Sequence, residues 1–269
     1  MGAAACSPSK SSPRIGIETI LAESGLAPAL LEKAKQALDT EPIVVTDESS
    51  ILAARLKAGE LELALTNGDL TTESLLRDGT VTSAKPILHH ETVLVGPAGD
   101  PLEIHAQRSF VTSMRLIYEG DAAFFQCTAC GLRARLDAIF ARERSLIRKG
   151  NSFRDVGPSE SDVVKALIGA PGYALLSRPT VIRLLKSKDW TMKPLWSGDA
   201  LQVDNYRVLL RPSDRIEEPR RVASAKLEAW LTGPSAKAII ESFGLDTHGQ
   251  AVFRAGPAPE GEGFKASPR

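Results

Sequence analysis

Two cysteines separated by two residues, Cys127 and Cys130, are the pair in this sequence best placed for chemistry. At the start of a helix, the helix dipole lowers a thiol pKa, which is what a redox-active dithiol needs. In an oxidising compartment the same spacing predicts a structural disulfide. The aromatic pair before it, Phe124–Phe125, is typical of a buried core. We therefore favour the disulfide and keep a redox or metal-handling role as the alternative.

His89, His90 and Glu91 form a second group, in which three consecutive side chains carry nitrogen or oxygen atoms that can bind a metal ion. Together with Glu119 and Asp121 they would supply ligands that several transition metals accept. The alternative is a polar rim whose members bond to neighbours and to water, and we favour it. No Gly-rich phosphate loop, Gly-x-Ser-x-Gly turn or His-Glu-x-x-His helix occurs. We expect no metal, no cofactor and no enzymatic activity.

Charge and length limit the classes of partner. The chain has 269 residues, a formal net charge of zero and a hydrophobic content of 43%. The balanced charge argues against a nucleic acid or an anionic membrane surface bound through bulk electrostatics. No run approaches the roughly 20 apolar residues of a transmembrane helix. The length suits one large or two medium domains with cores of their own.

Strands and helices alternate along the chain, which predicts mainly parallel sheets flanked by helices, an α/β fold. Two apolar strands, Thr92–Val95 and Tyr206–Pro212, are expected to carry the chain from one lobe to another and back. Gly96-Pro97 ends the first of them. Two crossings would leave a hinged cleft between the lobes. The expected lobes are residues 14–94 with 206–254, and residues 97–204.

Three local predictions concern the elements that position the polar residues. Pro42–Thr46 is short and apolar, and we expect a buried strand there. Ser113–Tyr118 is predicted to be a strand that ends in a loop at Glu119–Asp121. Ala123–Arg144 is predicted to be one long helix with an apolar stripe.

The N-terminal residues resemble the end of a bacterial lipoprotein signal. Small residues, Gly2–Ala5, precede Cys6, and the Ser/Pro-rich stretch after it is too polar to fold. We expect Cys6 to be lipidated, residues 1–13 to be a flexible tether, and the native precursor to carry an upstream apolar segment. The protein would then be a membrane-anchored lipoprotein of the periplasm or cell surface. Residues 255–269, rich in Gly, Pro and Glu, are expected to be disordered.

The order and spacing of five motifs resemble the tungstate-type substrate-binding proteins of ABC importers, which have the two-lobed type II periplasmic binding protein fold. The motifs are Glu23–Leu26, Leu61–Thr66, Val93–Pro97, Pro171–Arg178 and Trp230–Ile240. The resemblance implies a non-enzymatic solute-binding protein, expected to be a monomer, that delivers a small polar ligand to an ABC permease. A two-lobed ligand-sensing domain is the alternative.

The resemblance also implies how the ligand would be held. The family binds its oxyanion with hydroxyls and backbone N–H groups at helix N-termini, together with an arginine. Arg178 is either a ligand contact or half of a salt bridge within its lobe, and we favour the salt bridge. The candidate ligand-binding residues are Thr19, Ser49, Ser50, Asn67, Glu119, Asp121, Ser159, Ser161 and Arg178.

Two departures from the family concern the charge of the ligand. The first loop is nearly all Thr and Ser in the family, and here it keeps one hydroxyl, Thr19. The second-lobe strand of the family ends in Ser-Arg-Gly-Asp, and here the corresponding stretch reads Tyr118-Glu119-Gly120-Asp121, so Glu119 stands in place of the arginine. A carboxylate there disfavours a divalent anion. We expect weak or no tungstate binding, and a ligand that offers hydrogen-bond donors or a positive charge.

Overall fold

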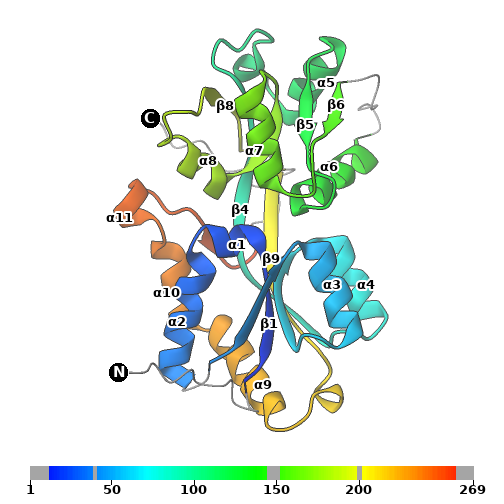
Figure 1. The fold of residues 1–269 in the computed structure, drawn as a ribbon, viewed down its shortest axis with the longest axis vertical. Coiled ribbons are helices and arrows are strands. Elements are labelled where there is room, and N and C mark those ends of the chain that lie inside the picture. Colours follow the sequence, from blue (N-terminus) through cyan, green and yellow to red (C-terminus); the bar gives the residue numbers. More distant parts are fainter. Residues whose placement is uncertain (1–11, 39–40, 144–151, 199–201, 259–269) are drawn as a thin grey trace, which may run out of the picture. The chain divides into compact units, whose positions relative to one another are not determined.

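The chain forms two compact units, and two of its strands run through both (Figure 1). The structure, a computed structural model, describes residues 12–38, 41–143, 152–198 and 202–258. Unit 1 contains the described residues up to Leu88 together with Tyr206–Phe243, and unit 2 contains the others. The chain leaves unit 1 within β4 (Ser83–Pro97) and returns within β9 (Val203–Leu210). Residues 89–94 and 244–254, expected in lobe 1, lie in unit 2.

Unit 1 is built on a sheet whose strands follow the order β2-β1-β3-β9. Strand β1 runs parallel to β2 and to β3, and β9 runs antiparallel to β3. Because parallel strands end on the same side, the carboxyl ends of β1, β2 and β3 meet at one edge of the sheet. The bounds are β1 Arg14–Glu18, β2 Ile43–Asp47 and β3 Leu63–Asn67.

Helices lie on both faces of this sheet, with α3 and α4 on one side and α2, α9 and α10 on the other (Figure 1). Helix α3 packs directly on β1: a Cβ at Gly16 would lie 2.7 Å from side-chain carbons of Leu52 and Leu61, so a larger residue does not fit there. The bounds are α1 Thr19–Glu23, α2 Leu26–Leu38, α3 Ser49–Ala58, α4 Asp69–Arg77, α9 Arg220–Leu231, α10 Pro234–Ser242 and a 3-10 turn Ser213–Arg215.

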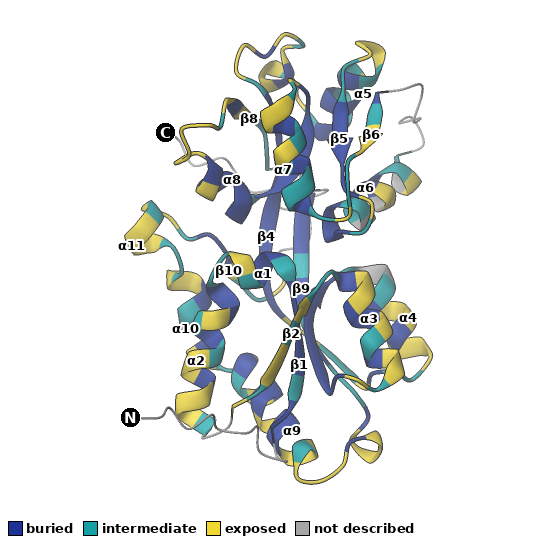
Figure 2. Ribbon diagram, viewed as in Figure 1, coloured by how far each residue is buried: buried dark blue, intermediate teal, exposed yellow. Residues whose placement is uncertain are grey.

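Strand β2 is the outermost strand of the sheet, and it is largely exposed (Figure 2). Ile43 is 38% exposed and Val44 is 46% exposed. The prediction of a buried strand at Pro42–Thr46 was therefore right in type and wrong in burial. Apolar composition alone does not distinguish a central strand from an edge strand, because edge position depends on pairing with distant segments.

Unit 2 combines antiparallel and parallel pairing. The second part of β4 pairs antiparallel with β7 and β8, while β5 and β6 pair in parallel. A parallel bridge between Phe124 and Tyr173 connects the two groups. The bounds are β5 Phe124–Gln126, β6 Phe153–Asp155, β7 Ala174–Ser177, β8 Met192–Trp196, β10 Arg254–Ala255, α5 Phe110–Glu119, α6 Gly131–Arg142, α7 Glu160–Gly169, α8 Arg178–Leu184, α11 Leu245–His248 and a 3-10 turn Ile104–Ala106.

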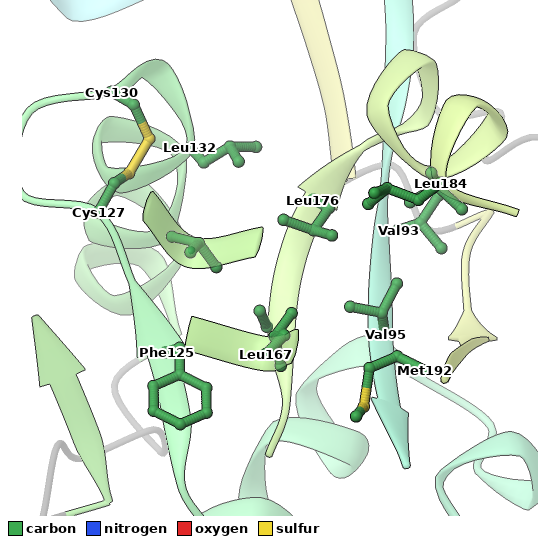
Figure 3. Packing of buried hydrophobic residues seen from close by; sticks show 13 residues of the cluster. Val93, Val95, Phe125, Cys127, Cys130, Leu132, Leu167, Leu176, Leu184 and Met192 are labelled. Atoms are coloured by element: carbon green, nitrogen blue, oxygen red, sulfur yellow. A yellow bond between two sulfur atoms is a disulfide. The ribbon is translucent and has the colours of Figure 1, made fainter. Parts of the chain in front are cut away.

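Successive residues in the strands of unit 2 pack into two separate hydrophobic cores, because neighbouring side chains of a strand point to opposite faces of the sheet. Val93 and Val95 pack with Leu176 and Phe125 in the first core (Figure 3). Their neighbours Leu94, Leu175 and Phe124 pack in the second, beneath α5 and α6. Strand β4 ends at Gly96-Pro97 as predicted, where a Cβ on Gly96 would lie 2.5 Å from the ring of Tyr173.

Two predicted elements of unit 2 were wrong. Ser113–Tyr118 belongs to helix α5, whose buried residues Phe110, Met114 and Ile117 recur every three to four positions. Ser109 caps this helix by accepting a hydrogen bond from the backbone N–H of Thr112 at 3.1 Å. The predicted helix Ala123–Arg144 is instead strand β5, a short loop and helix α6.

The C-terminal prediction also needs correction. Arg254–Ala255 form β10, which pairs with β4. The carbonyl oxygen of Gly256 lies 2.9 Å from Nδ1 of His89, and the backbone N–H of Ala258 donates to Asn205 at 2.9 Å. The expected disordered tail therefore begins no earlier than residue 259, and its remainder, like Cys6 and most of the expected tether, lies outside the described residues. Among the described helices, none has the length and hydrophobicity to cross a bilayer.

Candidate functional site

Polar side chains gather where β1, β2 and β3 end in unit 1. The oxygens of Thr66, Ser49 and Asn67 form a chain: the Thr66 hydroxyl donates to Ser49 Oγ at 2.8 Å, and Ser49 donates to Asn67 Oδ1 at 2.7 Å. The backbone N–H of Asn67 donates to Glu18 Oε2 at 3.1 Å. All four residues are buried. Of these, the sequence identified Ser49 and Asn67 and missed Glu18 and Thr66.

Glu48 lies beside this group, at the N-cap of α3. Burial raises the pKa of its carboxyl to about 6, and a hydrogen bond with Thr19 opposes that rise. The acidic neighbours Glu23 and Asp47 add to it. Thr19 therefore lies at the same edge as Ser49 and Asn67, whereas Ser50 is exposed on the first turn of α3. Glu48 was also missed, although it directly precedes the predicted serines.

In unit 2, the strands β5, β6 and β7 run parallel and also end at one edge. Ser159 lies there, but both of its polar groups serve helix α7: its backbone N–H donates to Asp162 Oδ2 at 3.1 Å, and its hydroxyl donates to the same oxygen at 2.7 Å and accepts from the Asp162 N–H at 3.3 Å. This reciprocal capping accounts for Ser159 without a ligand. Ser161 is half-buried on the first turn of the same helix.

Glu160 begins α7 and is almost fully buried. Its carboxylate accepts hydrogen bonds from the backbone N–H of Ser177 at 2.6 Å and from the hydroxyls of Ser177 and Thr180, both at 3.0 Å. Burial nevertheless raises the pKa of Glu160 to about 7. The sequence did not point to this residue, which ties the start of α7 to the start of α8.

Arg178 follows β7 and pairs within unit 2. Its guanidinium donates to Glu91 Oε2 at 2.8 Å and to Gln250 Oε1 at 2.9 Å. The salt bridge within one lobe, which the sequence analysis favoured, is therefore present in the structure. Burial raises the pKa of Glu91, and the charge of Arg178 opposes that rise.

The chain is similar in sequence and in fold to known tungstate-binding proteins. No protein-family model matches the chain. It is 21% identical over 246 residues to the tungstate-binding protein TupA of Peptoclostridium acidaminophilum, which covers 91% of this chain and 85% of that protein. The tungstate-binding protein TupA from Desulfovibrio alaskensis G20 superposes with a TM-score of 0.76 at 16% identity, over 94% of this chain and 100% of that one. The tungstate ABC transporter structure from Geobacter sulfurreducens gives 0.78 at 18% identity, over 87% and 100%.

The resemblance to the tungstate-type substrate-binding proteins is confirmed. The fold is likewise the predicted α/β fold of type II periplasmic binding proteins. The candidate edge of unit 2 lies elsewhere than expected, because β5 and not Ser113–Tyr118 is the strand that ends beside β6 and β7. The residues at the carboxyl end of β5 are Gln126–Ala129, and they include no arginine.

Glu119 and Asp121 were therefore assigned to the wrong place. Glu119 is exposed at the last turn of α5, and Asp121 lies in the loop before β5, at the amino end of that strand. Asp121 accepts a hydrogen bond from the Ser152 hydroxyl at 3.2 Å. Neither residue lies at the edge where β5, β6 and β7 end, so the charge argument built on Glu119 does not hold.

The candidate metal group is not assembled. His89 and His90 are consecutive in β4, so their side chains point to opposite faces of the strand. Nδ1 of His89 lies 2.9 Å from the Gly256 carbonyl oxygen, and Nδ1 of His90 lies 2.8 Å from that of Glu91. Within the described ranges, no three His, Cys, Asp or Glu side chains come together as metal ligands.

Cys127 and Cys130 are joined by a disulfide that connects the end of β5 to the start of α6. They are 1% and 3% exposed and pack among Phe125, Leu132 and Val163 (Figure 3). The disulfide thus closes a short loop inside a hydrophobic core, as a structural bond does.

Reduction of this disulfide is expected to lower the free energy of unfolding by about 2 kcal/mol, because a closed loop of this size restricts the unfolded chain modestly. Chemical denaturation with and without a dithiol reductant measures the difference. The double variant Cys127→Ser, Cys130→Ser should be less stable than the parent and insensitive to the reductant. Equal stability of the oxidised and reduced parent would contradict a structural role.

Proposed function

We propose that the protein is an extracytoplasmic solute-binding protein that delivers a small polar ligand of the oxyanion class to an ABC permease. The relatives named above bind tungstate or belong to a tungstate transporter, and the similarity spans nearly the whole chain. The protein would act as a monomer and without catalysis, as binding proteins of importers do. A ligand-sensing role stays the alternative, and co-purification with a permease or with a regulator distinguishes the two.

The observation that carries the proposal is the buried polar group where β1, β2 and β3 end. Ser49, Thr66 and Asn67 are buried there and hydrogen-bond to one another, which fixes the orientation of their polar atoms. The carboxyl edge of parallel strands is the place where open α/β sheets bind ligands. The proposed contacts at this edge of unit 1 are Thr19, Ser49, Ser50 and Asn67.

Localisation follows from the same proposal. A binding protein that serves an importer must meet its ligand outside the cytoplasm and stay near the permease. Lipidation of Cys6 would hold it at the membrane, and Ser7–Pro13 would act as the tether. Mass spectrometry of the protein isolated from its native membrane would detect the lipid on Cys6, and an unmodified, unprocessed N-terminus would contradict the anchor.

A panel of oxyanions is expected to contain at least one ligand that raises the melting temperature of the protein. A ligand at a hundred times its Kd stabilises the folded state by about 2.7 kcal/mol. Calorimetry on the responding ion then gives its affinity. Ser49→Ala should weaken that affinity about tenfold or more, because it breaks the chain of hydrogen bonds from Thr66 to Asn67.

The matched control is Ser242→Ala, which removes an exposed hydroxyl on α10 that bonds to its own helix. It should bind as the parent does. If no oxyanion stabilises the parent, or if Ser49→Ala and Ser242→Ala bind alike, the proposed site is wrong.

A further inference from the structure

Three arginines of unit 1 come together at the amino ends of β1 and β3, the edge of the sheet opposite to the candidate site. Arg14 begins β1, Arg211 follows β9, and Arg215 lies in the 3-10 turn after it. Because β9 runs antiparallel to β3, its end lies beside the start of β3, where the backbone N–H of Arg211 donates to the carbonyl oxygen of Glu62 at 3.0 Å. No local sequence spacing brings Arg14 and Arg211 together, so the cluster appears only in the fold.

Gly59 lets two of these guanidinium groups approach the same turn. Its carbonyl oxygen accepts a hydrogen bond from Nη2 of Arg14 at 3.1 Å. A Cβ on Gly59 would lie 3.3 Å from both Nη1 and Nη2 of Arg211, so this guanidinium lies directly against the glycine. The left-handed conformation of Gly59, with φ of 78°, ends α3 and suits a residue without a side chain. The guanidinium groups of Arg14 and Arg211 therefore share one neighbour.

The carboxylate of Glu62 pairs with two arginines, and Arg211 is not one of them. It lies 2.7 Å from Nη2 of Arg14 and 3.1 Å from Nη1 of Arg220. Arg211 is half-buried, and its guanidinium has no hydrogen-bond acceptor and no carboxylate at salt-bridge distance in the described part of the chain. Burial lowers the pKa of Arg211, and the charge of Glu62 opposes that shift. The charges of Arg215 and Arg14 lower the same pKa further, as nearby cations do.

We infer that unit 1 has a second anion site, in which the guanidinium of Arg211, with Arg14 and Arg215 beside it, binds a phosphate group. The planar fork of a guanidinium matches two oxygens of a phosphate, and a bound anion would offset the mutual repulsion of the three cations. The site does not depend on the proposed function, because it lies at the opposite ends of the strands from Thr19, Ser49 and Asn67. The same chemistry suits free phosphate and the phosphate of a lipid headgroup.

Phosphate is expected to stabilise the parent and not Arg211→Gln. Urea denaturation of the full chain at pH 7 compares phosphate with chloride at equal ionic strength, so general screening is the same in both. Calorimetry should show that Arg211→Gln weakens phosphate binding about tenfold or more. In chloride, the variant should be at least as stable as the parent, because the guanidinium it loses is an uncompensated charge beside other cations. A merely structural role of Arg211 would give the opposite result in chloride.

Two variants control for net charge and for the proposed ligand site. Arg77→Gln removes an exposed arginine on the last turn of α4, changes the net charge equally, and should bind phosphate as the parent does. Ser49→Ala should retain the phosphate binding that Arg211→Gln loses. The reverse pattern, loss in Ser49→Ala and retention in Arg211→Gln, would assign the phosphate to the proposed ligand site and overturn the arginine site.

Vesicle binding separates the two sources of the phosphate group. If Cys6 carries the lipid anchor, the chain from there to Arg14 spans at most roughly 28 Å, so headgroups are within reach of this end of unit 1. Sedimentation of the full chain with phosphatidylglycerol vesicles in phosphate-free buffer, with phosphatidylcholine vesicles as the uncharged reference, measures that binding. Binding to phosphatidylglycerol that Arg211→Gln reduces supports a headgroup, and phosphate binding without vesicle binding supports the free ion.

The outcomes also separate this inference from the proposed function. If the parent and Arg211→Gln respond alike to phosphate and to vesicles, the arginine site is wrong and solute binding at the other edge is untouched. If Arg211→Gln loses phosphate binding while no oxyanion responds to Ser49→Ala, the arginine site stands and the proposed ligand site is wrong.

Discussion

Replacement of Glu62 by alanine is expected to lower the free energy of unfolding by about 3 kcal/mol. The carboxylate of Glu62 is 2% exposed and holds two arginines: it accepts from Arg14 at 2.7 Å and from Arg220 at 3.1 Å. It also accepts from the backbone N–H of Arg14 at 2.6 Å, at the start of β1. Its removal leaves two cations close together and a backbone donor without its acceptor, and urea denaturation of the variant measures the cost.

Glu60→Ala is the matched control, two residues away. Glu60 is 54% exposed and pairs with Arg55 at 2.6 Å, so its loss should cost no more than about 1 kcal/mol. Glu62→Gln should fall between the two variants, since the amide oxygen still accepts while the charge is lost. If Glu62→Ala were as stable as Glu60→Ala, the buried ion network would not be what joins β1 and β3 to α9.

The alternation of strands and helices in unit 1 could be predicted from local pattern. Leu26, Leu30 and Ala34 recur at helical spacing and are buried in α2, and Gly59 ends α3 in a left-handed conformation. In these places local spacing and tertiary packing favour the same structure. The prediction therefore needed no knowledge of distant contacts.

The segment Ser113–Tyr118 shows where local pattern is insufficient. Met114, Leu116 and Tyr118 alternate as in a strand, while Phe110, Met114 and Ile117 recur as in a helix. Packing decides between them: the helical set is fully buried, and Ser109 caps the first turn. Recognition of Ser109 as an N-cap would have favoured the helix and moved the next strand to β5.

That single error displaced the candidate site in unit 2. With the strand placed at 113–118, the residue after it was Glu119; with the strand at 124–126, the residues after it are Cys127–Ala129. The expectation of poor tungstate binding stays a prediction, and it now rests on the loss of hydroxyls in the first loop, where Thr19 remains, without the support of Glu119. Pairs such as Glu91 with Arg178 are separated by 87 positions, and no local spacing reveals them.

Glu160→Gln is expected to remove most of a stability change that the parent shows with pH. Burial raises the pKa of Glu160 from 4.5 to about 7. Between those values the folded protein holds a proton that the unfolded chain has released, so the free energy of unfolding falls as pH rises. The loss from this one group is on the order of 3 kcal/mol and is complete a little above pH 7.

Glutamine keeps the size of the side chain and an oxygen for the Ser177 N–H and the hydroxyls of Ser177 and Thr180, but it carries no titrating proton. Urea denaturation at pH 5, 6, 7 and 8 should therefore give a parent that loses stability and a Glu160→Gln variant with a flatter profile. The two profiles should differ most above pH 7, where the parent must keep a buried charge at the junction of α7 and α8 and the variant need not.

Glu241→Gln, which changes an exposed carboxylate on α10 that pairs loosely with Lys237, should retain the profile of the parent. Parallel profiles for the parent and Glu160→Gln would show that this carboxyl titrates as it does in the unfolded chain, and that its three hydrogen bonds offset the cost of burying its charge.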